Sequence, residues 1–138
     1  MTLAIAGIDH IALTVADLDR ATSFYIDIGG KLARSYDIDG RRMVNQVHLG
    51  GAMLNIHQAG HSHPLVASRP TPGAGDFCFR WSEAIDSAVA LLKGAGIPII
   101  DGPVERFASD GRAGMSIYFR DPDGNLLEFL STVETSQA

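Results

Sequence analysis

The sequence has few of the features that mark secreted, membrane or nucleic-acid-binding proteins. Its 138 residues include one cysteine, Cys78, so no disulfide can form within the chain, which favours a reducing compartment. The start of the chain has no basic segment and reaches Asp9 after a short apolar stretch, unlike a signal peptide. No apolar run approaches the ~20 residues of a membrane-spanning helix. We therefore expect a cytoplasmic protein.

Positive charge is also scarce. The chain has 11 Lys and Arg against 16 Asp and Glu, a net charge of −5, and no basic cluster. Because nucleic acids and anionic membranes bind through clustered Lys and Arg, neither is expected as a partner. The 46% hydrophobic and 20% charged residues are enough to form a core, and the length favours one domain.

The pattern of apolar and polar residues in the first half of the chain predicts one strand, one helix and three more strands. Residues 8–15 alternate with period two, which is typical of a half-buried strand. A helix is expected from Asp17 to Gly29-Gly30, a C-terminal cap sequence. Short strands are expected over residues 31–36, 42–49 and 52–58, with turns at Asp39-Gly40 and Gly50-Gly51.

The second half repeats this order after a segment, residues 59–75, that is rich in Gly, His, Ser and Pro and has no periodicity. A strand is expected over residues 76–81 and a helix over 84–93. Three further strands are expected over residues 98–102, 115–120 and 125–130. The turn Asp121-Pro122-Asp123-Gly124 joins the last two.

The two halves align at an offset of 66 residues, which places His10 with Asp76, Val15 with Trp81 and Gly30 with Gly96. A long period that occurs only twice indicates a duplicated module. We predict an α+β fold made of two βαβββ modules in one domain, residues 1–138. Module 1 spans about residues 1–60, the linker about 61–74 and module 2 about 75–133.

Strand alternation also predicts where polar side chains gather. If the apolar residues pack on the helices, the opposite face of the sheet carries His10, Asn55, His57, Asp76 and Glu128. Imidazole and carboxylate are donors for Zn²⁺, Ni²⁺, Mn²⁺ or Fe²⁺. These residues therefore predict a divalent metal site, with the alternative that each side chain is simply hydrogen-bonded.

Two segments resemble the vicinal oxygen chelate (glyoxalase/bleomycin-resistance/dioxygenase) superfamily. Residues 8–15 followed by Phe24-Tyr25 resemble the opening of its module, and residues 119–128 resemble its closing signature. Over nearly the whole chain, residues 55–60, 70–73 with Asp76, and 102–106 resemble the subgroup of glyoxalase-domain-containing "virulence proteins".

The resemblance implies two modules that pair into a curved mixed sheet with the helices on the outer face, in a homodimer that binds a small-molecule substrate. It implies a divalent metal held by His10, Asp76, Glu128 and a residue of the strand that carries Asn55 and His57. The implied activity is that of a glyoxalase-like lyase or isomerase, acting on a small oxygen-rich substrate through an enediolate-like intermediate. Glu128 would double as the proton-transfer base.

The sequence departs from the family pattern at two positions. Asp76 stands where the opening strand of the second module usually supplies His, and Asn55 is the repeat equivalent of Glu128. The ligand sets of lactoylglutathione lyases, ring-cleaving dioxygenases and fosfomycin thiol transferases are therefore not reproduced. The predicted metal ligands are His10, His57, Asp76 and Glu128. The sequence leaves open whether His57 or Asn55 is the ligand from the strand that carries them both.

Other side chains are candidates for contacts with the substrate. Tyr118 and Glu128 are the predicted catalytic residues, and the predicted substrate-binding residues are Asn55, Arg80, Arg106 and Tyr118. Arginine clamps carboxylates, and a tyrosine hydroxyl binds oxygen. Cys78 is interpreted as a small buried side chain. His61 and His63 are interpreted as solvated loop residues.

Two other functions remain open from the sequence. One is an Fe(II) extradiol-type dioxygenase, which dependence on O₂ would identify. The other is a non-catalytic, bleomycin-resistance-like protein that sequesters a ligand without metal. The sequence also leaves open whether the cleft forms within one chain or across a swapped dimer.

Overall fold

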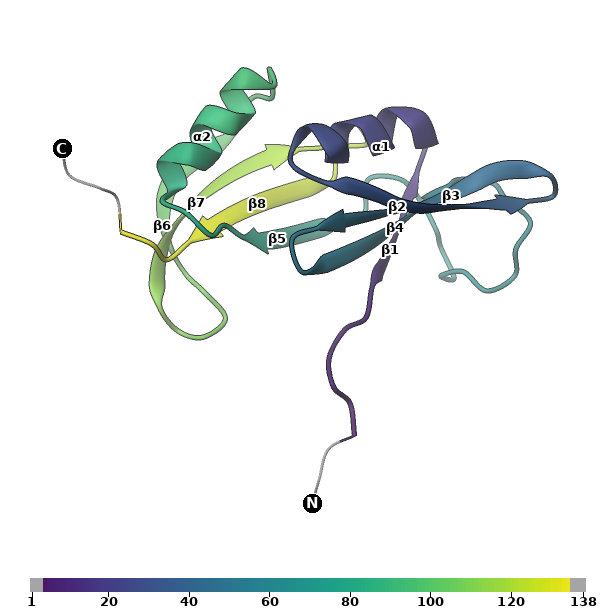
Figure 1. The fold of residues 1–138 in the computed structure, drawn as a ribbon, viewed down its shortest axis with the longest axis horizontal. Coiled ribbons are helices and arrows are strands. Elements are labelled where there is room, and N and C mark those ends of the chain that lie inside the picture. The colour runs from purple at the N-terminus through teal and green to yellow at the C-terminus, as the bar shows by residue number, and fades with distance from the viewer. Residues whose placement is uncertain (1–3, 135–138) are drawn as a thin grey trace. The chain divides into compact units, whose positions relative to one another are not determined.

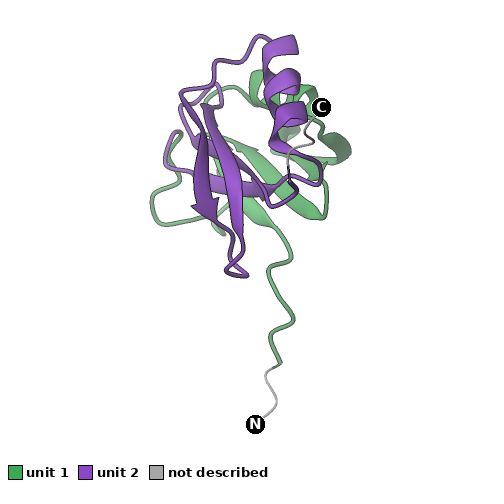
Figure 2. Cartoon of the chain, turned by 90° about the vertical axis from the view of Figure 1, so that its left-hand side faces the viewer, with its two compact units in different colours: residues 1–72 green, residues 73–138 purple. Residues whose placement is uncertain are grey.

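The computed structural model describes residues 4–134, and the start and end of the chain considered in the sequence lie partly outside the described residues, at 1–3 and 135–138. The chain divides into two compact units, residues 1–72 and 73–138 (Figure 2). Unit 1 contains β1 (Ile11–Val15), α1 (Leu18–Asp27), β2 (Lys31–Ile38), β3 (Arg41–Leu49) and β4 (Ala52–Gln58) (Figure 1). Unit 2 contains β5 (Asp76–Arg80), α2 (Ile85–Gly94), β6 (Asp101–Phe107), β7 (Ala113–Arg120) and β8 (Leu126–Ser131).

The two units share one topology. Their sheets have the orders β1-β4-β3-β2 and β5-β8-β7-β6, and in each the first strand pairs in parallel with the last while the remaining pairs are antiparallel. The predicted α+β fold of duplicated βαβββ modules is confirmed.

In unit 1, α1 begins at the predicted residue because the Asp17 carboxylate accepts a hydrogen bond from the Arg20 backbone N–H at 3.0 Å. The helix lies against β3 and β4. Its apolar face buries Tyr25, which is fully enclosed, and the sheet face beneath the helix buries Val47, Leu54 and Ile56. This packing leaves the other face of β4 to its polar side chains.

In unit 2, α2 covers β7 and β8 in the same way. Phe129 is the centre of an aromatic cluster, with ring centroids 4.9 Å from Trp81, 4.8 Å from Phe119 and 6.3 Å from Phe79. Because Leu127 and Phe129 point into this core, Glu128 lies on the face of β8 that α2 does not cover.

The strand registers establish which residues of the two units are equivalent. Ala12 pairs with Asn55 in unit 1, and Cys78 pairs with Glu128 in unit 2. Ala12 and Cys78 are equivalent at the offset of 66 residues, so their strand partners Asn55 and Glu128 are also equivalent, as the sequence repeat predicts. His57 falls one pleat further along, where unit 2 has Leu130.

Two predicted strands differ from those observed. The first was expected to begin at Ile8 but begins at Ile11, because the ladder with β4 starts at the pair Ile11 and Leu54. The strand expected over residues 98–102 instead runs over Asp101–Phe107. The apolar run that includes Ile100 was misleading: the continuous ladder with β7 begins at Val104, after a register shift.

Residues 59–75 contain neither helix nor strand, as their composition predicts. The Ser62 hydroxyl of this loop donates a short hydrogen bond to Asp39 in the turn between β2 and β3. Asp39 has a φ of 55°, a left-handed conformation that Asp adopts more readily than most residues. Within residues 4–134, neither helix has the length and apolar character needed to cross a membrane.

Replacing Gly30 tests the packing of α1 on its sheet. A Cβ at Gly30 would lie 2.6 Å from the Tyr25 carbonyl oxygen and 2.7 Å from Val47 Cγ1. We expect Gly30→Ala to lower the free energy of unfolding by about 1–3 kcal/mol, because the backbone must shift to admit the methyl group. Gly51→Ala, whose Cβ would meet no atom within 4 Å, should change it by less than about 0.5 kcal/mol. Urea denaturation of both variants measures the difference; equal losses would contradict the packing.

Candidate functional site

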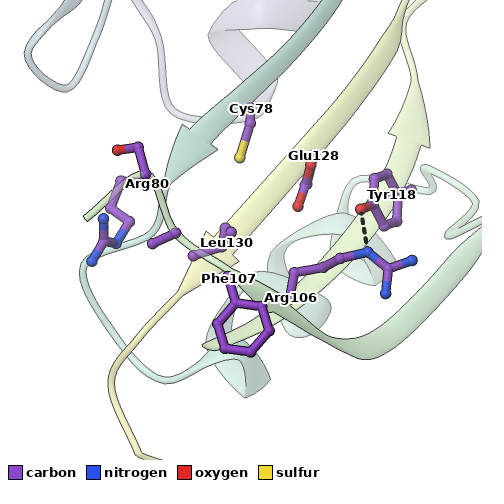
Figure 3. Close-up of a pocket in the computed structure, with 9 residues that line it drawn as sticks. Cys78, Arg80, Arg106, Phe107, Tyr118, Glu128 and Leu130 are labelled. Atoms are coloured by element: carbon purple, nitrogen blue, oxygen red, sulfur yellow. Dashed lines mark hydrogen bonds between the residues drawn. The ribbon is translucent and has the colours of Figure 1, made fainter. Parts of the chain in front are cut away.

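Unit 2 contains a cavity of about 460 Å³ on the face of its sheet that the helix does not cover (Figure 3). Its floor comes from β5, β8 and β7, and its wall from the end of β6 and the loop after it. The lining residues are Cys78, Arg80, Arg106, Phe107, Ala108, Ser109, Tyr118, Glu128 and Leu130.

Register pairing places three titratable side chains in one row across the floor. Glu128 on β8 is paired with Cys78 on β5 on one side and with Tyr118 on β7 on the other. The neighbours of Tyr118 along β7, Ile117 and Phe119, are fully buried beneath the helix, so Tyr118 is on the cavity face. The carboxylate therefore lies between a thiol and a phenol.

Arg106 brings positive charge to this row. Its Nε donates to the Tyr118 hydroxyl oxygen at 3.0 Å, and its guanidinium carbon lies 5.7 Å from the centroid of the Tyr118 ring (Figure 3). Because the hydroxyl oxygen accepts from arginine, the O–H of Tyr118 remains a donor. The pair offers hydrogen-bond donors to an oxygen-bearing ligand.

Arg80 lines the opposite side of the cavity and holds the loop between β6 and β7. Its Nη2 donates to Thr132 Oγ1 at 2.9 Å and to Asp110 Oδ2 at 3.3 Å. The pKa of the Asp110 carboxyl is lowered, first by the hydrogen bond from the Arg112 backbone N–H and then by hydrogen bonds from Arg80 and Arg112. Arg80 is thus a structural ion-pair partner as well as a cavity residue.

Cys78 is a protonated thiol at neutral pH. Cys78 is exposed, not the small buried side chain that the sequence indicated. Its pKa is raised from 9.0 to about 11, first by partial burial of the thiol and then by the negative charge and hydrogen bond of Glu128. Because the thiolate is the reactive form of cysteine, Cys78 is a weak nucleophile. It acts on the site as a neighbour of Glu128.

Unit 1 holds a second group of titratable side chains, all of them histidines. His57 Nδ1 lies 3.1 Å from His61 Nε2, and the ring of His63 lies 6.4 Å from that of His61. Burial lowers the pKa of His57, and repulsion from His61, His63 and His10 lowers it further. His57 is therefore a neutral imidazole at physiological pH.

The other predicted residues of unit 1 differ in their surroundings. His10 precedes β1 and its Nδ1 lies 2.8 Å from the Asp9 carboxylate. Asn55 is on the same face of β4 as His57, and its buried Oδ1 has no hydrogen-bond partner among the described residues.

The structure thus brings some of the predicted site residues together and separates others. Arg80, Arg106, Tyr118 and Glu128 line one cavity, whereas Asp76 lies on β5 two residues before Cys78 and does not line it. His10, Asn55 and His57 belong to unit 1. Among residues 4–134, no three His, Cys, Asp or Glu side chains form a group that could hold a metal ion.

Two contributions were missed by sequence reasoning. Phe107 and Ser109 line the cavity because β6 continues beyond its predicted end. His61, interpreted as a solvated loop residue, contacts His57. The spacing of four residues between the two histidines was the signal in the sequence for this pair.

A search of known protein families matches residues 7–129 to the model described as Glyoxalase/Bleomycin resistance protein/Dioxygenase superfamily. Virulence protein STM3117 of Salmonella typhimurium is 40% identical over 126 residues, 91% of this chain and 84% of that protein. Glyoxalase domain-containing protein RDO1 of Mycosarcoma maydis is 34% identical over 94% of this chain and 70% of its own length. Metallothiol transferase FosB of Shouchella clausii is 30% identical over 88% of this chain and 77% of its own length.

Solved structures give the same picture. A protein from the mobile metagenome of V. Pseudocholerae has a TM-score of 0.86 and 33% identity, covering 97% of this chain and 100% of its own. The crystal structure of STM3117 has a TM-score of 0.82 and 39% identity, covering 95% and 100%. FosX of Listeria monocytogenes, crystallised with Mn(II) and 1S,2S-dihydroxypropylphosphonic acid, has a TM-score of 0.63 and 25% identity, covering 94% and 92%.

The alkylation rate of Cys78 tests whether the Glu128 carboxylate lies beside its thiol on the cavity floor. With a pKa of about 11, about one thiol in a thousand is ionised at pH 8, so alkylation by iodoacetamide should be slow and should accelerate as the pH rises toward 11. Glu128→Gln removes the negative charge that raises this pKa, so the alkylation rate at pH 8 should increase severalfold. Asp86→Asn, an exposed position on α2, is the matched control and should leave the rate unchanged. A fast reaction at pH 8 in the wild type would contradict the assignment.

Proposed function

The chain belongs to the glyoxalase/bleomycin resistance protein/dioxygenase superfamily, and from that premise we propose that it is a metal-dependent lyase or isomerase acting on a small oxygen-rich substrate. The observation that carries the proposal is the position of Glu128 on the cavity floor, between Cys78 and Tyr118 and near Arg106. A carboxylate beside hydrogen-bond donors suits proton transfer at a carbon that neighbours an oxygen.

Each cavity residue has a role in this proposal. Glu128 takes or returns the proton. The Tyr118 O–H and the Arg106 guanidinium bind and orient the oxygen atoms of the substrate, since both are donors on the same face. Arg80 holds the loop after β6 against the cavity through Asp110 and adds positive charge there. Phe107, 71% exposed, presents an apolar surface at the cavity wall.

The chemistry of the available donors fits a borderline divalent ion. His10 donates its Nδ1–H to the Asp9 carboxylate, and in a neutral ring this hydrogen bond directs the lone pair to Nε2, the tautomer that metal-binding histidines commonly adopt. We propose that His10, Asp76 and Glu128 hold Zn²⁺, Ni²⁺, Mn²⁺ or Fe²⁺, with any fourth donor coming from β4. The ion would supply a Lewis acid for two oxygens of the substrate.

Support for a metal comes from relatives. FosB is a metallothiol transferase by name, and FosX was crystallised with Mn(II). We also propose that the protein is a homodimer located in the cytoplasm, as expected from the sequence. Light scattering would measure its oligomeric state.

Metal content tests the proposal without knowledge of the substrate. Protein purified without added metal, and then equilibrated with one equivalent of Zn²⁺, Ni²⁺, Mn²⁺ or Fe²⁺, should retain one ion per chain by elemental analysis. We expect His10→Ala and Glu128→Gln each to lower the retained ion at least tenfold, because each removes a donor, and even the loss of a ligand's hydrogen-bond partner costs about 10–100-fold in metal affinity.

Cys78→Ser and Asp86→Asn should keep the wild-type metal content, the first because Cys78 is not one of the proposed donors and the second because Asp86 is exposed on α2. Full occupancy in both donor variants would overturn the ligand assignment. Wild-type protein that retains no metal but binds small molecules would instead favour a ligand-sequestering protein, and turnover that requires O₂ would favour a dioxygenase.

A further inference from the structure

The loop after β4 fixes the protonation pattern of His61. The backbone N–H of His63 donates to His61 Nδ1 at 3.2 Å. Because a backbone N–H can only donate, His61 Nδ1 is the acceptor and carries no proton in this hydrogen bond, which places the N–H of the ring on Nε2.

His61 in turn fixes the protonation pattern of His57. His61 Nε2 lies 3.1 Å from His57 Nδ1, and the two ring centroids are 5.4 Å apart. Since His61 Nε2 is the donor, His57 Nδ1 is the acceptor, and the proton of the neutral His57 ring is on Nε2. The lowered pKa of His57, caused by burial and then by its histidine neighbours, agrees with an uncharged ring.

The contacts of the loop hold His61 in this position. Ser62 donates to Asp39 in the turn between β2 and β3, and the Leu65 backbone N–H donates to His63 Nδ1 at 3.1 Å. The residues that follow His61 are therefore held in place, Ser62 by the turn between β2 and β3 and His63 by the backbone of Leu65.

His57 and His10 have opposite tautomers as a result. His10 donates through Nδ1 to Asp9 and keeps the Nε2 lone pair, whereas His57 accepts at Nδ1 and keeps a proton on Nε2. A metal at His57 Nε2 would require the proton to move to Nδ1, where it would face the Nε2–H of His61. The repeat gives no reason to expect a ligand there either, since the equivalent of His57 in unit 2 is Leu130.

We propose that His61 is a positioning residue that presents His57 as a hydrogen-bond donor, and that His57 binds an acceptor oxygen of the substrate through Nε2–H and does not bind the metal. The suitable partners are a carboxylate, carbonyl or phosphonate oxygen, which share this acceptor chemistry. The substrate part of this inference rests on the proposed function; the tautomers rest on the hydrogen bonds of unit 1 alone. It replaces the expectation that His57 is a metal ligand.

The ring nitrogens report the tautomers directly. In the ¹⁵N-labelled full-length protein at pH 8, two-bond ¹H–¹⁵N spectra should show His57 and His61 each with a protonated Nε2 and an unprotonated Nδ1. His61→Ala removes the donor to His57 Nδ1, so His57 should shift to a mixture of its two tautomers. His61→Asn, whose side-chain amide can donate, should restore part of the Nε2–H form. His48→Ala, an exposed position on β3, is the matched control and should change nothing.

Metal addition separates this proposal from the proposed function. One equivalent of Zn²⁺ should leave the His57 Nε2–H signal in place, and His57→Ala should retain Zn²⁺ at the wild-type level while His10→Ala does not. A protonated His57 Nδ1, or a His57 Nε2 that loses its proton on Zn²⁺ addition, would overturn the inference. If the His10 and Glu128 variants retain full Zn²⁺ while the His57 tautomer is as described, the ligand assignment fails and the positioning role of His61 stands.

Discussion

The parallel pairing of the first and last strands within each unit determines which side chains can meet. Once Cys78 is paired with Glu128, and Glu128 with Tyr118, the pleat places all three on the same side of the sheet. A shift of one residue in β8 would exchange Glu128 for Leu127 or Phe129, which α2 needs for its core. The burial of these apolar residues therefore holds the carboxylate in the cavity.

The same constraint explains how far sequence reasoning could go. Alternation in residues 115–120, and the apolar Leu127 and Phe129 on either side of Glu128, were enough to predict the faces of Tyr118 and Glu128. The cap at Asp17 and the glycines after α1 predicted the bounds of that helix closely. The register of the repeat also identified Asn55 as the equivalent of Glu128, which the observed ladders confirm.

Local sequence did not predict the features that depend on tertiary contacts. The apolar residues 97–100 resemble a strand by composition, but the ladder with β7 is continuous only after the register shift between Asp101 and Val104. That shift brings Arg106 and Phe107 to the cavity. The contact between His57 and His61 depends on the path of the loop, which is held by Ser62 and Asp39, 23 residues apart in the chain. No short-range pattern encodes such a contact.

The two sheets have the same strand order and pairing but differ in which equivalent positions carry titratable side chains. The row Ala12, Asn55 and Gln46 of unit 1 is the equivalent of Cys78, Glu128 and Tyr118 in unit 2, yet none of its three side chains titrates, whereas all three in unit 2 do. A chain with two copies of one architecture therefore carries three adjacent titratable side chains in only one of these two equivalent rows. Selection on the backbone frame and selection on the side chains of a row can act separately after a duplication.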